Sequence, residues 1–206
     1  MRTKKITALI VSAMFCFMCS LGSYAESPID TYESWKPELK QYTQQICAEY
    51  DVDYSLALAV IYNESRFQSG LTHKNSNGTI DYGLMQVNEV NFDFLQKTVG
   101  IKSMWDLLDD KVGIRCGVEL LAYHKDYTGE DSSALLRYQI GEGKYRKYIK
   151  RGQYTNDTHS KVWQYRETYV EYLSSQNEIN SESKLTGFFK RDPIVGILNM
   201  WVATPT

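Results

Sequence analysis

The segment at residues 54–66 limits what this chain can fold into more than any other. Ala57 and Val60 recur there at a spacing that places side chains on one face of an α-helix, and Glu64 continues the same face. Asp53, immediately before the segment, is a residue type that commonly caps the first turn of a helix. The pattern therefore predicts a core helix that carries a carboxylic acid on its apolar side, near its C-terminal end.

Helical periodicity also dominates the rest of the chain. With 43% hydrophobic and 23% charged residues, the composition is that of a chain with a packed core. No segment shows the alternation and turn spacing of a β-sandwich or barrel, so we expect a mainly α fold in a single domain over residues 26–173. Residues 28–37 are expected to form an irregular lead-in, and residues 69–81 a polar loop. Further helices are predicted at residues 38–49, 92–99, 111–127, 132–139 and 161–173.

The composition changes after residue 173. Residues 174–183 are polar and poor in apolar side chains, which is typical of linkers. Residues 193–203 are apolar but too few to span a bilayer. We therefore predict that residues 174–206 form a linker and a C-terminal tail, whose role the sequence does not define.

The first 25 residues have the order of a secretory signal peptide. Three basic residues lie within the first five positions, an almost unbroken apolar run follows at residues 6–21, and Ser23 and Ala25 form a small-x-small cleavage site. The competing interpretation is a retained membrane anchor, but the apolar run is shorter than the roughly 20 residues that a span requires. We expect a processed chain that begins at Glu26, is exported to the periplasm, cell wall or extracellular space, and keeps no stable membrane span.

Processing at this site changes the charge and the cysteine content. The removed segment holds three basic residues and no acid, so the net charge moves from -2 to -5. A mildly acidic chain without a basic run is a poor partner for nucleic acid or for an anionic lipid surface. Cys47 and Cys116 remain, and in an exported protein they form either one disulfide or two buried free thiols. The sequence leaves both open, and we predict the disulfide if the two lie on neighbouring helices.

Glu64 is the strongest candidate for a catalytic group. A glutamate is seldom buried without a reason, because an unpaired charge in an apolar setting is costly. Desolvation and the negative end of the helix dipole both raise a carboxyl pKa, which keeps the acid protonated near neutral pH and able to donate a proton. The alternative is a structural role, in which Glu64 pairs with Arg66 or caps a loop. Periodicity by itself favours the structural role, so the surrounding motifs decide.

Three motifs follow one another in the chain. Glu64-Ser65 comes first, residues 75–88 (NSNGTIDYGLMQVN) follow, and residues 134–141 (ALLRYQIG) come much later. In order and spacing they resemble the E-S, G-L-M-Q and A-Y-N-x-G motifs of the soluble lytic transglycosylase family, glycoside hydrolase family 23. The second motif is most similar to that of the small members that accompany secretion and conjugation machines. The resemblance extends over about residues 44–162.

The resemblance implies a lysozyme-like α fold with a sugar-binding cleft and Glu64 at its floor. Glu64 would protonate the oxygen between N-acetylmuramic acid and N-acetylglucosamine in peptidoglycan, while the substrate's own N-acetyl group stabilises the sugar cation. It would then take the proton of the C6 hydroxyl, which attacks to give a 1,6-anhydro end, for local remodelling of the cell wall. This scheme departs from the usual pair of carboxylates, and it needs no metal or cofactor. A secretion or conjugation apparatus is a candidate partner by the same resemblance.

The same resemblance assigns roles to the second motif. Gln86 would hydrogen-bond the substrate, Met85 would line the cleft and pack on a sugar, and Gly83 would allow close approach of the backbone. Asp81, just before them, is expected to begin a turn. We therefore expect no second carboxylate to take part in the chemistry.

The first and third motifs supply the remaining candidates for substrate binding. Ser65 would lie at the start of the loop beside the cleft, and Tyr138 would donate its phenol to Glu64. Gln139 stands where the family usually has the shorter asparagine, so its hydrogen bonds must be arranged differently. His159 stands where the family tends to have tyrosine, and it either tunes substrate contact with pH or lies on the surface.

Other functions remain to be weighed against this one. A true hydrolase, as in goose-type lysozymes, would share the fold and the glutamate but use water, and its products would have reducing muramic ends. A non-catalytic peptidoglycan-binding protein could keep the same cleft. A metalloenzyme is disfavoured because His73, His124 and His159 have no ligand spacing.

Overall fold

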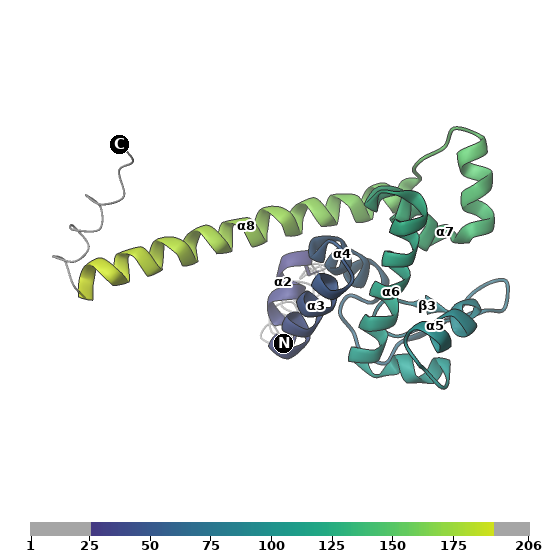
Figure 1. The fold of residues 1–206 in the computed structure, drawn as a ribbon, viewed down its shortest axis with the longest axis horizontal. Helices are drawn as coiled ribbons and strands as arrows, with labels where there is room; N and C mark the ends of the chain where they lie inside the picture. Colours follow the sequence, from purple (N-terminus) through teal and green to yellow (C-terminus); the bar gives the residue numbers. More distant parts are fainter. Residues whose placement is uncertain (1–25, 192–206) are drawn as a thin grey trace, which may run out of the picture.

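The computed structural model describes the backbone of residues 26–191 and the side chains of residues 26–177 (Figure 1). The predicted signal peptide and the apolar residues 193–203 lie outside this range. Helices predominate within it, which confirms the predicted mainly α fold. In chain order the elements are α2 (Pro28–Ser34), α3 (Pro37–Glu49), α4 (Tyr54–Ser65), β1 (Thr72–Lys74), β2 (Ile80–Tyr82), β3 (Val87–Asn88), the 3₁₀ helix η1 (Glu89–Asn91), α5 (Phe92–Thr98), the 3₁₀ helix η2 (Met104–Leu108), α6 (Asp110–Thr128), α7 (Asp131–Lys150) and α8 (Asp157–Arg191).

The central helix of the core is α4. Asp53 caps it, with its carboxylate accepting a hydrogen bond from the Ser55 backbone N–H at 2.8 Å, as predicted. Most of its side chains are buried because α2, α3 and α8 pack around it. It ends at Ser65, since the next residue adopts the left-handed conformation. Asn63 and Glu64 in its last turn are only partly buried.

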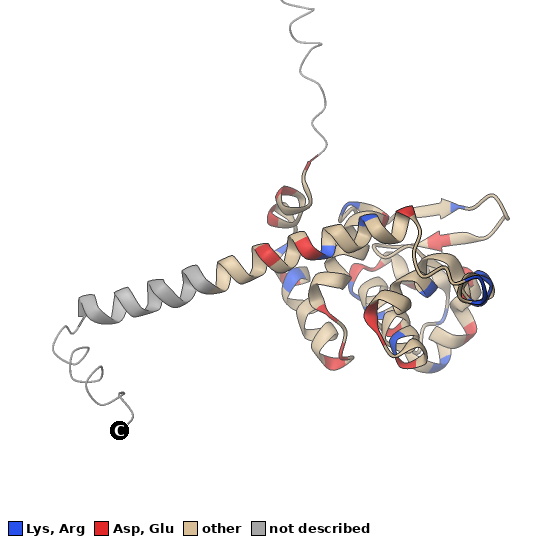
Figure 2. Ribbon diagram, turned by 90° about the horizontal axis from the view of Figure 1, so that it is seen from above, with Lys and Arg blue, Asp and Glu red and all other residues tan. Residues whose placement is uncertain are grey.

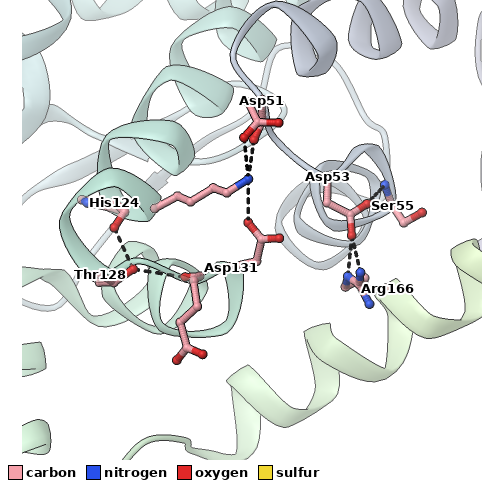
Figure 3. A network of polar contacts seen from close by, with 9 residues as sticks. Asp51, Asp53, Ser55, His124, Thr128, Asp131 and Arg166 are labelled. Atoms are coloured by element: carbon pink, nitrogen blue, oxygen red, sulfur yellow. Dashed lines mark hydrogen bonds and ion pairs between the residues drawn. The ribbon is translucent and has the colours of Figure 1, made fainter.

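Ion pairs connect the outer helices to this core (Figure 3). Arg166 of α8 binds the Asp53 carboxylate through Nε at 2.6 Å, so Asp53 both caps α4 and holds α8 against it. Lys125 of α6 lies 3.1 Å from Asp51 and 3.6 Å from Asp131, the first residue of α7. These side chains keep some exposure to water, so each pair adds modest stability beside the buried apolar core.

A helix forms where an irregular lead-in was expected. Ser27 caps α2 by accepting a hydrogen bond from the Asp30 N–H, and Pro28 occupies the first helical position, where its missing N–H costs nothing. Tyr32 of α2 packs edge-on against Tyr169 of α8. The Ser-Pro pair is a helix-start signal, and the prediction for this segment was wrong because the helix that follows it is only two turns long.

Three short antiparallel strands form a sheet that occupies part of the expected loop at residues 69–81, in the order β1-β2-β3. The turn between β1 and β2 closes through a hydrogen bond from the Asn75 N–H to the Thr79 carbonyl at 2.8 Å, and Gly78 takes a φ of 90°. Strands of two or three residues, with β1 fully exposed, show no alternation of apolar and polar side chains. The loop prediction was therefore wrong for these strands, although Asn77-Gly78 is a known hairpin signal.

A kink at Gly141 divides α7 into two halves. The helix predicted at residues 132–139 begins at Asp131, and Gly141 then interrupts it with a φ of 74° and a ψ of 159°. A residue with a side chain rarely adopts this conformation. The first half of α7 therefore ends close to the predicted end of this helix, but a second helical half follows and continues to Lys150.

The last helix is longer than the predicted one at residues 161–173. It begins at Asp157 and continues to Arg191, and in Figure 1 it extends past the other helices. The polar segment that begins at residue 174 is therefore helical rather than an irregular linker. The division of the chain into a domain at residues 26–173 and a tail at residues 174–206 remains a prediction.

The two cysteines of the expected mature chain lie on α3 and α6, which pack against each other, but they do not form a disulfide. Both are free and buried, so the prediction of a bond between neighbouring helices was wrong and the free-thiol alternative holds. Burial raises the pKa of the Cys47 thiol to about 12, and that of Cys116 to about 12. Both therefore act as small apolar core residues.

Within the described residues, no helix is long and apolar enough to cross a membrane.

Candidate active site

A cleft of about 700 Å³ opens beside the C-terminal end of α4. Its lining comes from the β-hairpin and the turn after it, from η1 and α5, and from α6 and α7. Four of the predicted site residues line it: Glu64, Gln86, Tyr138 and Gln139. The fold therefore brings residues of all three motifs to one cleft.

Glu64 enters the cleft from the last turn of α4. The side-chain amide of Asn63 donates a hydrogen bond to its Oε1 at 3.0 Å. Burial raises the pKa of the Glu64 carboxyl above its ordinary value; the bond from Asn63 partly offsets this, and the charge of Asp81 adds to it. Arg66, the partner that a structural role would require, instead lies over the Tyr62 ring at 3.9 Å and donates to the Tyr62 carbonyl.

Tyr138 lines the cleft from the first half of α7. We expected its phenol to donate to Glu64, but it donates to the backbone carbonyl of Met85 at 2.7 Å. That carbonyl belongs to the turn between β2 and β3, where strand pairing does not satisfy it. Burial, followed by the nearby charges of Glu64 and Asp81, raises the pKa of Tyr138 well above its ordinary value. The charge of Glu64 thus affects Tyr138, but the Tyr138 hydroxyl holds the turn at Met85 and does not orient the Glu64 carboxyl group.

Met85 lies in the core rather than in the cleft. Its side chain is fully buried, which contradicts the predicted contact with a sugar. It packs against Gly117 of α6, where an added Cβ would lie 2.2 Å from the Met85 Sδ. The close fit depends on a glycine far along the chain, so local sequence could not reveal it.

The predicted close approach at Gly83 exists, but it is to the protein's own backbone. Gly83 has a φ of 72°, and a Cβ there would lie 2.2 Å from the Leu107 carbonyl oxygen. A Cβ on Gly113 of α6 would lie 2.6 Å from the same oxygen. The segment continues to Gln86, which has a φ of 47°, lines the cleft and donates from Nε2 to the Gly83 carbonyl at 2.7 Å. The two glycines therefore fix the turn that presents Gln86.

The two remaining motif residues differ in their placement. Ser65 is buried, and its hydroxyl donates to the Ile61 carbonyl at 3.0 Å, so its side chain stays within α4 and does not line the cleft. Gln139 does line the cleft, and its amide oxygen and nitrogen are buried without a hydrogen-bond partner among the described residues. Buried polar groups in folded proteins usually have such a partner, and Gln139 is one of the exceptions.

His159 lies neither in the cleft nor on the surface. It is buried at the start of α8, where its ring stacks on Trp163 and lies within hydrogen-bond distance of Ser132 and Thr155. Both expectations for His159 were therefore wrong, and the residue joins the first turns of α7 and α8.

Asp81 lies in β2 and lines the cleft, although it was expected to begin a turn. The side-chain amide of Asn75 donates to its Oδ2 at 2.9 Å, and that of Asn88 donates to its Oδ1 at 2.6 Å. Sequence alone missed this placement because the strand that carries Asp81 is too short to be recognised.

Comparison with known proteins now adds the family. Residues 41–161 match the family model described as the transglycosylase SLT domain, which is more than half of the chain. The chain belongs to this family. The SLT domain has a structural counterpart in an inactive mutant of the lytic transglycosylase Slt from Pseudomonas aeruginosa, with a TM-score of 0.55 and 20% sequence identity. The match covers 66% of this chain and 24% of that one, and it supports the predicted lysozyme-like fold.

A curated relative is more similar in sequence over a shorter stretch. It is a "Peptidoglycan-binding-like protein" of Escherichia coli O157:H7, 38% identical over 69 residues. The match covers 33% of this chain and 41% of the relative's length.

The described part of the SLT domain and α8 contains no group of three or more residues that could hold a metal ion.

Basic residues gather beside the cleft of the SLT domain, on the second half of α7. Figure 2 shows this half end-on as a blue ring at the edge of the molecule. Lys144 lines the cleft, and the next basic residues are also exposed, so the expectation of a chain without a basic run was wrong here. They are Lys144, Arg146, Lys147, Lys150 and Arg151, with Glu142 as the one acid among them. A local positive patch therefore adjoins the cleft that Glu64 and Asp81 line.

Proposed function

We propose that the SLT domain is a peptidoglycan lytic transglycosylase, which cleaves the bond between N-acetylmuramic acid and N-acetylglucosamine and leaves 1,6-anhydromuramic ends. The observation that carries the proposal is Glu64: a partly buried carboxyl group with a raised pKa in the wall of a large cleft. A carboxyl group that stays protonated near neutral pH can act as a general acid toward a glycosidic oxygen.

Glu64 performs both proton transfers in this mechanism. Its carboxyl proton moves to the oxygen of the scissile bond as the C1–O bond breaks, and N-acetylglucosamine leaves with a hydroxyl group. The substrate's N-acetyl carbonyl stabilises the positive charge at C1. The Glu64 carboxylate then accepts the proton of the C6 hydroxyl, whose oxygen forms the new bond to C1. Glu64 is protonated again at the end, so no outside acid or base is consumed.

The residues around Glu64 support its orientation. Asn63 holds one carboxyl oxygen at 3.0 Å. Tyr138 fixes the turn that carries Gln86 through its bond to the Met85 carbonyl. Gln86 and Gln139 line the cleft, and amide side chains suit the hydroxyl and acetamido groups of a glycan.

Asp81 is the observation that favours a second candidate, a muramidase that uses water. It lines the same cleft, and its charge contributes to the raised pKa of Glu64. A glycosidase with two carboxyl groups can use the second to stabilise the sugar cation or to activate water. In the transglycosylase that we propose, Asp81 acts on Glu64 only through its charge and organises Asn75 and Asn88.

The deciding experiment is digestion of insoluble peptidoglycan by the mature chain in ¹⁸O-labelled water, followed by mass analysis of the products. Unlabelled anhydromuramic ends support the proposal, whereas labelled reducing ends establish the muramidase. The Glu64→Gln variant, which keeps the shape of the side chain, is the control for cleavage by this site. Binding of peptidoglycan without any cleavage by the unaltered chain would instead establish the third possibility, a non-catalytic binding protein.

The cellular setting is also part of the proposal. The predicted signal peptide would deliver the enzyme to the cell wall, where its role would be local remodelling, with a secretion or conjugation apparatus as the candidate partner. Cleavage of a tagged chain between Ala25 and Glu26 during export, identified by N-terminal sequencing, tests the first step. An uncleaved, membrane-retained chain would establish the anchor alternative.

A further inference from the structure

His124 lines the cleft and has no part in the mechanism above. It lies in the second half of α6, and Nη1 of Arg137 is 3.0 Å from its Nδ1. A guanidinium group can only donate hydrogen bonds, so Nδ1 must be the acceptor. A neutral imidazole with Nδ1 as acceptor carries its proton on Nε2. Arg137 therefore selects one tautomer of His124.

Arg137 is itself held firmly in place. Its side chain is 1% exposed, and its Nη2 lies 3.2 Å from the Glu142 carboxylate across the kink of α7. The guanidinium carbon is 4.0 Å from the centre of the Tyr127 ring and 5.1 Å from that of Tyr123. A buried cation fixed by a carboxylate and two rings has little freedom to release His124.

The Nε2–H group of His124 is free to bind a ligand. Nε2 has no hydrogen-bond partner among the described residues and is not fully buried, and the residue lines the cleft. The ring lies edge-on to Tyr138, with 6.3 Å between the ring centres. The His124 ring centre is also 5.4 Å from that of Tyr123, which packs against Phe94 at 4.7 Å. Both of these aromatic rings line the cleft. His124 is thus in contact both with Tyr138 and with one ring of an aromatic pair.

We propose that His124 is a specificity-determining residue, whose Nε2–H donates a hydrogen bond to an uncharged acceptor oxygen of an N-acetylated glycan bound in the cleft, beside the Phe94–Tyr123 pair. This inference rests on the proposed function, because it takes a glycan as the ligand. Aromatic side chains offer apolar faces on which sugar rings pack, and a fixed neutral donor next to them selects an acceptor such as an acetamido carbonyl or a hydroxyl oxygen.

The charges around His124 keep it in this neutral state. The pKa of His124 is lowered to about 4, first by burial and then by the positive charge of Arg137, against a smaller opposing effect of Glu142. Tyr138, with its raised pKa, is also uncharged. The donor is therefore present without a positive charge throughout the physiological range of pH.

The first test is nuclear magnetic resonance of the histidine rings in the full mature chain, which needs no ligand. The chain holds three histidines, so variants of His73 and His159 assign the signals. We expect His124 as the Nε2–H tautomer, with no titration midpoint between pH 5 and pH 8, from the lowered pKa of about 4. An Nδ1–H tautomer, or a midpoint near the ordinary value of about 6.5, overturns the proposal.

The second test measures binding of tetra-N-acetylchitotetraose by calorimetry, in a Glu64→Gln background that prevents cleavage. Adding His124→Leu removes the donor, and we expect a roughly 3- to 10-fold rise in Kd. Adding His124→Gln places an amide N–H near the former Nε2, and we expect a Kd within about twofold of the background value.

The two variants separate the inference from the proposed function. Equal Kd values for the Leu variant and its background, or equal weakening by Leu and Gln, overturn the role of His124, even if the unaltered chain cleaves peptidoglycan. If the Kd values are as expected but the unaltered chain cleaves no peptidoglycan, the role of His124 is supported and the enzymatic proposal is overturned. If the Glu64→Gln background binds no oligomer at all, that result is sufficient to overturn the role of His124.

Discussion

Replacement of Gly83 by alanine should destabilise the domain by more than its backbone conformation explains. Gly83 has a φ of 72°, and the added Cβ would lie 2.2 Å from the Leu107 carbonyl oxygen. Gly70 has nearly the same φ, 73°, but an added Cβ there would meet no atom within 4 Å. Gly70→Ala is therefore a matched control that carries the backbone cost without the clash.

The two costs can be estimated separately. A left-handed conformation costs an alanine about 1–2 kcal/mol relative to glycine, and both variants bear this cost. Overpacking against a fixed backbone atom adds about 1–3 kcal/mol, and Gly83→Ala bears it alone. In a domain of this size each kcal/mol lowers Tm by roughly 2–4 °C. We therefore expect Gly83→Ala to melt roughly 2–12 °C below Gly70→Ala.

The assay is thermal unfolding of the two mature variants, followed by far-ultraviolet circular dichroism under identical conditions. Equal losses of Tm in the two variants would refute the argument, because they would show that the Leu107 carbonyl moves aside without cost. A larger loss in Gly70→Ala would refute it as well.

Three other outcomes follow from the site. Glu64→Gln should reduce release of soluble fragments from peptidoglycan at least ~10²-fold while its circular dichroism spectrum stays native, as expected for loss of a general acid; near-normal release by the folded variant would remove Glu64 from the mechanism. The same variant should be more stable than the unaltered chain near neutral pH, because the raised pKa of Glu64 means that ionising this carboxyl group costs more free energy in the folded state than in the unfolded chain. This advantage should disappear below the ordinary carboxyl pKa of 4.5, where both states are protonated, and urea unfolding across that range measures it. In the Glu64→Gln background, the further changes Lys147→Gln and Lys150→Gln should weaken sedimentation with insoluble peptidoglycan at low salt but not at high salt. The same changes at Lys97 and Lys102, outside the patch, are the control, and equal effects at both pairs would contradict a local role for the patch.

The sequence predicted the helical core because its signals are local. Apolar spacing and the cap at Asp53 define α4, and the glycine at position 141 marks the break in α7. The motifs also placed Glu64 and Gln86 in the cleft correctly. In these cases the information lies within a few residues of the feature that it predicts.

The misplaced residues depend on contacts between distant segments. Met85 lies in the core because Gly117 leaves room for it on another helix. His124 and Arg137 form a pair from α6 and α7, and neither residue shows a pattern along its own helix that reveals the other. Asp81 reaches the cleft on a strand of three residues, which is too short to give a periodic signal. Such features become visible only when the elements are assembled.

The close contacts of the glycines differ in whether a second mutation can relieve them. The obstacle at Gly117 is the Met85 side chain, so a smaller residue at position 85 would make room for alanine at 117. The obstacle at Gly83 and at Gly113 is the backbone oxygen of Leu107, which no substitution removes. In a combinatorial library selected for folding, positions 85 and 117 should therefore covary, whereas 83 and 113 should stay glycine whatever their neighbours are. The two glycines that fix the turn presenting Gln86 therefore resist substitution, whereas positions 85 and 117 can change if both change together.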